Sequence, residues 1–132
     1  MERKNINRGF TQLRVWNSAI ELYILVCKRL ANMPYDLRKS VSNATDACQS
    51  ISRNIAEGYC RKSTADYLKF LNYSISSSGE LFSCLYSFKA ANQIPEEVFE
   101  EIDILHYKTE NELLALIKSL ENKIRRNNAK SQ

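Results

Sequence analysis

Apolar side chains recur every three or four residues along most of this sequence, a spacing that places them on one face of an α-helix. Four such stretches are separated by three short breaks. The pattern predicts helices over about residues 12–32, 36–57, 64–91 and 95–126. Only 3 glycines and 2 prolines occur among 132 residues, and this scarcity of chain breakers favours long helices.

The breaks between the predicted helices are short, and links of this length usually join antiparallel neighbours. We therefore predict an all-α fold, an antiparallel up-down-up-down four-helix bundle. A chain of 132 residues has the usual size of one domain, so residues 1–132 are assigned to a single domain. The polar ends, residues 1–9 and 127–132, are predicted to be flexible.

The turn between the second and third predicted helices carries recognisable end signals. Gly58 is placed to end the second helix in a left-handed conformation, which costs glycine little. Ser63 is the natural N-cap of the third helix, and Asp66 lies three residues on, where a carboxylate favours the positive end of a helix. These residues predict a short, well-defined corner at residues 58–66.

The middle of the third predicted helix is unusual because small, poor helix formers follow one another there. They are Ser74, Ser76, Ser77, Ser78 and Gly79. Such a run indicates either the close approach of a neighbouring helix or a locally weak helix. The sequence leaves both interpretations open.

The net charge of +4 is unevenly distributed along the chain. Residues 1–14 carry four basic side chains against one acidic, and residues 118–132 carry five against one. Residues 95–114 instead carry seven acidic side chains against Lys108 alone. The polarity of the last helix is partly explained by its dipole, which favours acids at the start and bases at the end. The two basic ends remain as candidate surfaces for an anionic partner.

Four cysteines and one histidine are the candidates for metal or nucleophilic chemistry. Cys27, Cys48, Cys60 and Cys84 contain no Cys-x-x-Cys pair, whereas structural zinc sites show tightly paired ligands. His106 alone cannot supply the Glu-x-x-His pairs of a di-iron bundle, and it does not lie at a tight turn. We therefore predict no metal, no cofactor and no enzyme. Cys60, beside two basic residues, is the remaining alternative as a reactive thiol.

Residues 54–67 concentrate polar, charged and aromatic side chains in one short corner. In one interpretation, basic side chains there meet phosphates while aromatic rings stack on bases. The residues concerned are Arg53, Arg61, Lys62, Lys69, Tyr59, Tyr67 and Phe70. In the other interpretation, the corner is purely structural, and the side chains of Asn54 and Glu57 bind backbone groups or arginine side chains.

The same corner resembles a known family, the four-helix-bundle proteins encoded in intervening sequences of bacterial 23S rRNA genes. The similarity lies in Asn54-Ile-Ala-Glu57-Gly58, then Arg61, Ser63, Tyr67 and Phe70-Leu71. The opening helix is similar in Phe10-x-x-Leu13-x-Val15-Trp16-x-x-Ala19-x-x-Leu22, and the third helix in Ser77-x-x-Glu80-Leu81. Ser52 stands where the family often has Pro, and Ser74 and Ser76 where it often has Ala and Gly.

The resemblance implies a bundle that assembles into a ring-like homopentamer and has no assigned catalytic activity. A branch similar in fold comprises accessory proteins of diversity-generating retroelements, which bind the reverse transcriptase and nucleic acid. Carried onto this chain, Asn54, Glu57, Gly58 and Arg61 shape the corner or a subunit contact, with Tyr67 in the same motif. The candidates for a surface that binds nucleic acid or a partner are Arg8, Arg14, Arg53, Arg61, Lys62, Lys69, Lys123, Arg125 and Arg126.

The leading hypothesis is a non-enzymatic homo-oligomer, a pentamer by resemblance, that binds RNA or an RNA–protein complex. The alternative is an accessory subunit of a diversity-generating retroelement that binds its reverse transcriptase, with Trp16, Tyr23 and Tyr86 as interface anchors. The start of the sequence has no apolar signal region, and no stretch is long enough to cross a membrane. We therefore expect the protein in the cytoplasm.

Overall fold

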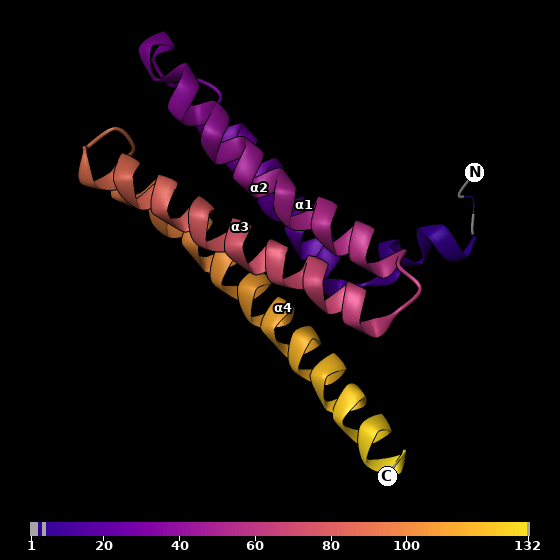
Figure 1. Cartoon of the computed structure of the whole chain (residues 1–132). Helices are drawn as coiled ribbons and strands as arrows, with labels where there is room; N and C mark the ends of the chain where they lie inside the picture. The colour runs from indigo at the N-terminus through magenta and orange to yellow at the C-terminus, as the bar shows by residue number, and fades with distance from the viewer. Residues whose placement is uncertain (1–2, 4, 132) are drawn as a thin grey trace.

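The computed structural model describes residue 3 and residues 5–131 (Figure 1). The described residues are helical apart from short connections and contain no strand, which confirms the predicted all-α fold. Lys4, part of the predicted basic N-terminal segment, lies outside the described residues, as do residues 1, 2 and 132. In chain order the elements are a 3-10 helix η1 (Ile6–Gln12), α1 (Arg14–Leu30), a 3-10 helix η2 (Tyr35–Leu37), α2 (Arg38–Tyr59), α3 (Thr64–Ala90) and α4 (Glu96–Lys130).

The four long helices lie where the periodicity predicts them, and the differences concern their ends. The residues before α1 form the separate helix η1, because Leu13 between them has extended backbone. The second predicted helix begins with η2 before α2 starts at Arg38. Residues 6–9 and 127–130, which the sequence assigns to the polar ends, have helical backbone.

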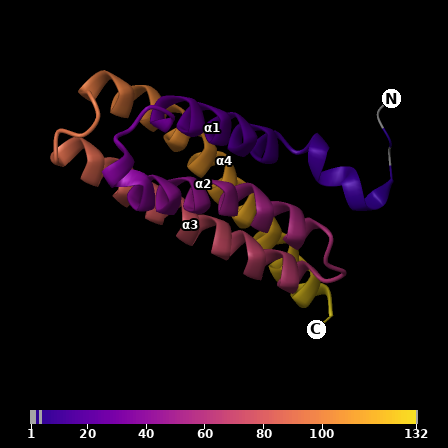
Figure 2. The ribbon, with the colours of Figure 1, turned by 90° about the horizontal axis from the view of Figure 1, so that it is seen from above.

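Consecutive long helices run in opposite directions, and their connections lie at alternating ends of the bundle (Figures 1 and 2). Each helix packs against two others: α1 against α2 and α4, and α3 against α2 and α4. The most extensive of these contacts joins α2 and α3.

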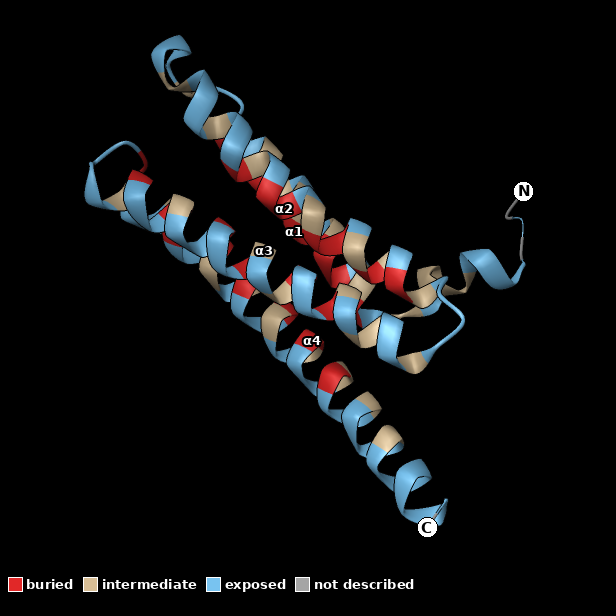
Figure 3. Ribbon diagram, viewed as in Figure 1, coloured by how far each residue is buried: buried red, intermediate tan, exposed pale blue. Residues whose placement is uncertain are grey.

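The core is a continuous set of apolar side chains on the inward faces of all four helices (Figure 3). Full burial of one such aliphatic side chain stabilises a fold by about 1.5–3 kcal/mol. The largest fully buried apolar side chains are Leu22, Val26, Ile51, Ile55, Leu71, Leu81, Leu85, Ile102 and Leu113. Trp16 and Tyr23, two of the predicted interface anchors, are partly buried against this core.

The serines of α3 mark close packing against α2. Ser74 is fully buried, and its hydroxyl donates a hydrogen bond to the backbone oxygen of Ile51, at 2.9 Å. The hydroxyl of Ser77 donates to that of Ser50, at 2.8 Å. Small side chains allow two helices to approach closely, and these two hydroxyls find partners on the neighbour. Gly79 differs, because a Cβ atom built there would meet no atom within 4 Å.

The C-terminal part of α4 extends beyond the rest of the bundle (Figures 1 and 3). Ile117 is the last buried residue of this helix, and after it only Leu120 and Ile124 are half-buried. This extension carries the basic residues at the end of α4. Among the described residues, no helix combines the length and apolar character needed to span a bilayer.

Substitution at the α2–α3 contact tests whether the serine run reflects close packing. Ser74→Val adds volume at a fully buried position, so we expect the free energy of unfolding to fall by about 1–3 kcal/mol. Ser76→Val, at an exposed position of the same helix, should change it by less than about 0.5 kcal/mol. Urea denaturation followed by circular dichroism measures both. Equal effects at the two positions would contradict close packing.

Candidate nucleic-acid interface

The alternating direction of the helices gathers the predicted basic residues at one end of the bundle. The start of α1, the end of α2 and the start of α3 lie at this end, as does η1, and the end of α4 projects beyond the bundle in the same direction along the helices (Figure 1). We call it the basic end. It contains all nine basic residues singled out from the sequence: Arg8, Arg14, Arg53, Arg61, Lys62, Lys69, Lys123, Arg125 and Arg126.

Most of these side chains are exposed and unpaired. Seven of the nine form no ion pair or side-chain hydrogen bond with any other described residue: Arg8, Arg53, Lys62, Lys69, Lys123, Arg125 and Arg126. Arg14 approaches the carboxylate of Glu112 at 3.9 Å and is otherwise open to solvent. An excess of unpaired positive charge at one end of a molecule attracts polyanions.

Arg61 is the exception, because the corner holds its guanidinium on two sides. Its Nη2 atom lies 2.8 Å from Oε1 of Glu57, one helical turn earlier. The guanidinium also lies over the ring of Phe70, 4.6 Å from the ring centroid. Arg61 therefore clamps the end of α2 to the start of α3, and its charge is compensated within the chain.

Asn54 and Ser63 have structural roles at the same corner. The amide nitrogen of Asn54 donates to the backbone oxygen and the hydroxyl of Ser50, at 2.9 and 3.0 Å. Ser50 is the residue that accepts the hydrogen bond from α3. The hydroxyl of Ser63 accepts a hydrogen bond from the backbone N–H of Asp66, at 3.1 Å, which confirms the predicted N-cap. Asn54 and Ser63 thus support the structural interpretation of the corner.

The prediction that Gly58 ends α2 in a left-handed conformation is wrong. α2 continues through Tyr59, and no glycine among the described residues has a positive φ. Gly58 is instead buried inside the helix, facing α3. A Cβ atom there would lie 2.9 Å from Cβ of Phe70 and 3.0 Å from Cδ1 of Tyr67. Glycine is required because α3 approaches the backbone of α2 too closely for a side chain.

An aromatic cluster attaches η1 to the corner. Phe10 meets Trp16 and Tyr59 edge-on, with centroid distances of 5.2 and 6.3 Å, and Tyr59 meets Tyr67 at 6.0 Å. The thiol of Cys60 donates to a backbone oxygen of η1, at 3.3 Å. Tyr59 and Tyr67, proposed from the sequence as stacking platforms for bases, are half-buried in this cluster. Their rings hold the N-terminal segment in place.

The hydroxyl of Tyr67 is buried at this junction and has no hydrogen-bond partner among the described residues. Burial disfavours the phenolate, and together with the nearby Tyr59 it raises the pKa of Tyr67 to about 12. A buried phenol of this kind packs the corner as an aromatic ring and takes no part in acid–base chemistry at neutral pH.

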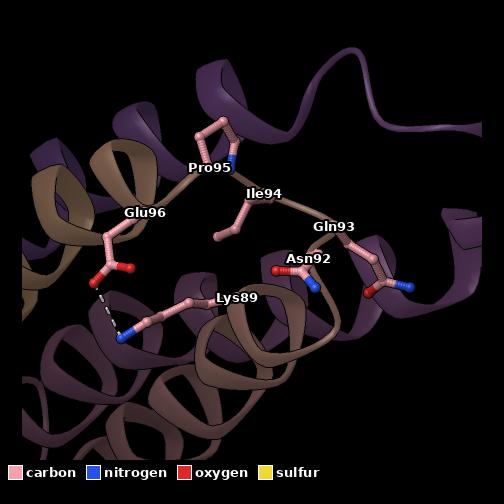
Figure 4. Close-up of a pocket in the computed structure, with 6 residues that line it drawn as sticks. All are labelled: Lys89, Asn92, Gln93, Ile94, Pro95 and Glu96. Atoms are coloured by element: carbon pink, nitrogen blue, oxygen red, sulfur yellow. Dashed lines mark ion pairs between the residues drawn. The ribbon is translucent and has the colours of Figure 1, made fainter.

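At the opposite end of the bundle, a polar hollow of about 360 Å³ lies in the α3–α4 connection (Figure 4). Its one basic side chain, Lys89, pairs with Glu96 at 3.5 Å and lies 4.6 Å from the ring centroid of Phe99. Asn92 adopts a left-handed backbone conformation in the turn, with φ of 57°. Because the lysine is already compensated, this hollow does not provide an anion site.

His106 and the cysteines do not form a nucleophilic or metal-binding arrangement in the described part of the chain. The ring Nε2 of His106 lies 2.8 Å from the backbone oxygen of Ser78, so this nitrogen carries a proton and cannot accept one from the serine hydroxyl. That hydroxyl donates to Glu110 instead, at 2.7 Å. Among the described residues, no three side chains are grouped to hold a metal ion. Burial raises the pKa of the Cys48 thiol to about 12.

These features define a class, the all-α bundle of four long helices with one basic end. The chain belongs to the family described as 23S rRNA-intervening sequence protein, which its sequence matches over residues 11–125. The fold is similar to the crystal structure of a protein of unknown function from the S23 ribosomal protein family of Bacteroides thetaiotaomicron VPI-5482, with a TM-score of 0.70 and 23% identity over 79% of this chain and 95% of that one. No curated protein matches the sequence.

Sequence reasoning missed η1 and its attachment to the corner. Gly9 and Phe10 precede the first periodic stretch, so no periodicity marks them as part of the packed structure. Only the family resemblance pointed to Phe10, as the first residue of the opening-helix motif. A Cβ atom at Gly9 would collide with the ring of Tyr59, which shows how closely η1 approaches α2. The signal available in the sequence was the glycine–aromatic pair beside an otherwise polar segment.

The two helical glycines provide a matched test of the corner. Gly58→Ala places a methyl group against Phe70 and Tyr67, and we expect the free energy of unfolding to fall by about 1–3 kcal/mol. Gly79→Ala meets open space inside α3 and should raise it by about 0.5–1 kcal/mol through helix propensity. Chemical denaturation of both variants measures the difference. Stabilisation by both substitutions would show that α2 and α3 are not in close contact at the corner.

The buried hydroxyl of Tyr67 predicts a loss of stability in alkali. From about pH 10 to about pH 12 the unfolded chain releases the phenol proton while the folded chain retains it, so stability falls as pH rises. Tyr67→Phe removes this contribution and the unpartnered hydroxyl. We expect stability at pH 7 to be unchanged or raised by up to about 1 kcal/mol, with a shallower decline above pH 10. Tyr73→Phe, at an exposed ring, is the control for both measurements.

Proposed function

We propose that this protein is a non-enzymatic, oligomeric bundle of the cytoplasm that binds RNA through its basic end. The observation that carries the proposal is the gathering of unpaired basic side chains from four elements at one end. If these basic side chains were spread evenly over the molecule, they would form an ordinary solvated surface. Brought together by the reversal of consecutive helices, they form a field directed outward from one end of the bundle.

The chemistry of the basic end favours contacts to the phosphate backbone over the reading of bases. Lysine and arginine side chains there are free to neutralise phosphates, whereas the rings of Tyr59 and Tyr67 are engaged with each other. With these two rings engaged, binding depends mainly on charge and shape, and a structured RNA presents both. Sequence preference is therefore expected to be low and dependence on salt strong.

The opposite end of the bundle has a different charge pattern, and this difference bears on which end RNA approaches. α4 begins there with Glu96, Glu97, Glu100 and Glu101, and Arg29 of α1 pairs with Glu101 at 2.7 Å. This pair lowers the pKa of Glu101 through its hydrogen bond to Arg29 and keeps both groups charged. The exposed Lys28, Arg38 and Lys39 also lie at this end, so its charge is mixed. The acids at the start of α4 offset these cations, which favours the basic end as the site for RNA.

Assembly is the second part of the proposal. The resemblance to the family implies a homopentamer, and copies arranged around an axis parallel to the helices would present their basic ends on one face. A ring would then add the fields of its subunits, which raises affinity for a polyanion without any new contact. Exposed apolar side chains on α3 and α4, including Tyr86 and Tyr107, support contact with other protein surfaces.

Charge reversal at the two ends tests the RNA-binding surface with matched variants. Lys62→Glu with Lys69→Glu alters the basic end, and Lys28→Glu with Lys39→Glu makes the same change in net charge at the other end. All four lysines are exposed. We expect the first pair to weaken binding of an RNA hairpin at low salt by roughly tenfold or more, and to reduce the slope of log K against log salt by about 2.

The second pair should bind nearly as the unaltered protein does, and fluorescence anisotropy at several salt concentrations measures all three. Equal weakening by both pairs would mean that net charge alone attracts RNA. Undetectable binding at low salt would reject the proposal and favour the alternative, a protein partner such as the reverse transcriptase of a diversity-generating retroelement.

A further inference from the structure

One face of α4, on the side of α3, carries a row of seven side chains that are exposed or half-buried. Their positions advance by four, three, four, four, three and four residues, so they share one stripe along the helix. We call this row the outer stripe. It consists of Asp103, Tyr107, Glu110, Leu114, Lys118, Glu121 and Arg125.

The charges of the outer stripe form no ion pairs among the described residues. Two carboxylates, Asp103 and Glu110, precede Leu114, and two cations, Lys118 and Arg125, follow it with a third carboxylate, Glu121, between them. None of the five takes part in an ion pair, and Glu110 accepts only the hydrogen bond from Ser78. Asp103 and Glu110 are also half-buried, and a carboxylate withdrawn from water is stabilised by a nearby cation.

A hollow of about 500 Å³ lies beside the acidic half of the stripe, between α3 and α4. It is open because Gly79 contributes no side chain. Phe82 and Tyr107 line it with rings that are 39% and 65% exposed, next to the two carboxylates. Aromatic faces beside carboxylates form a site that suits an alkylammonium or guanidinium group.

A lysine is bound by an aromatic ring and a carboxylate nearby, further along α3 toward its C-terminal end. Phe82 packs against Phe99, with ring centroids 6.1 Å apart, and Lys89 of the same chain lies over Phe99 at 4.6 Å. The carboxylate of Glu96 completes that arrangement at 3.5 Å. An aromatic ring and a carboxylate thus hold a lysine there. The neighbouring hollow is lined by the same kinds of group, and none of its described lining residues is a lysine or an arginine.

The outer stripe is complementary to itself when its direction is reversed. Leu114, 48% exposed, is its centre, and the spacing is symmetric about it. Asp103 and Arg125 lie equally far from Leu114 on opposite sides, and so do Glu110 and Lys118. A second α4 laid antiparallel along the stripe therefore places a cation opposite Asp103 and opposite Glu110 of each copy, and the phenol of Tyr107 opposite the third carboxylate, Glu121.

We propose that two copies of this chain pair through their outer stripes, with the α4 helices antiparallel and Leu114 against Leu114. Lys118 of one copy then lies opposite Glu110 of the other, at the edge of the hollow, and Arg125 lies opposite Asp103. The contact is isologous and runs for about 33 Å of helix. It rests on the proposal that the protein assembles, but it is a contact separate from the parallel ring and joins two chains, or two rings if a fivefold ring forms. It takes Arg125 out of the basic end and leaves the other cations there free.

Charge reversal with rescue tests this pairing. One variant carries Asp103→Lys and Glu110→Lys, a second carries Lys118→Glu and Arg125→Glu, and a third carries all four changes. We expect the first two to have half the molar mass of the unaltered protein by light scattering, because each stripe then repels its copy. The third variant, and a 1:1 mixture of the first two, should recover the original mass because complementarity is restored.

The outcomes separate this pairing from assembly in general. An unaltered protein that is monomeric at micromolar concentration rejects both. An unaltered protein of larger mass that keeps that mass in all variants rejects the stripe contact and retains assembly through other surfaces. Circular dichroism verifies that each variant keeps its helices, and loss of helix in the third variant as well would show that folding, and not pairing, was altered and would reject the rescue.

A cross-link tests the register independently of charge. Leu114→Cys, in a background with Cys60→Ser, places a thiol at the centre of the proposed contact, and mild oxidation should convert most of the protein to a disulfide-linked dimer. Lys108→Cys, exposed on another face of α4, is the matched control and should cross-link little. Equal cross-linking of the two variants would overturn the proposed register.

Discussion

The close contact between α2 and α3 is the constraint on which the rest of the structure depends. Small residues on both helices make it possible: Gly58 and Ser50 on α2, and Ser74 and Ser77 on α3. Two inter-helix hydrogen bonds satisfy the buried hydroxyls, so close approach leaves no orphaned polar group there. This pair sets the connection at residues 60–63, and α1 and α4 pack against the pair to close the core.

The corner shows how residues that look functional can serve packing. Arg61 is held by Glu57 and Phe70, and Tyr59 and Tyr67 attach η1 to the bundle. The unpaired lysines and arginines around the corner form no such contacts with other described residues. A rigid aromatic centre surrounded by free cations is suited to meeting a polyanion by charge and shape, which agrees with the function proposed for the basic end.

α4 combines two kinds of electrostatics in one helix. Acids at its start and bases at its end complement the helix dipole, and this accounts for part of the sequence polarity. The side on which those charges lie is not set by the dipole. The outer stripe places two acids before Leu114 and two bases at the mirror positions after it, beside exposed aromatic rings, and the proposed second copy of the chain would pair them.

The sequence by itself determined the helical fold, the positions of the four helices and the N-cap at Ser63, because these depend on local periodicity and on neighbours within one turn. It could not distinguish a tight contact from a soft helix at Ser74, nor predict that Gly58 lies inside α2. It also left η1 out of the packed structure. Those features depend on contacts between residues that are far apart in the sequence. Examples are the contact of Phe70 with Gly58 and that of Tyr59 with Gly9. The basic end likewise arises only when reversal of the chain brings residues from η1, α2, α3 and α4 together.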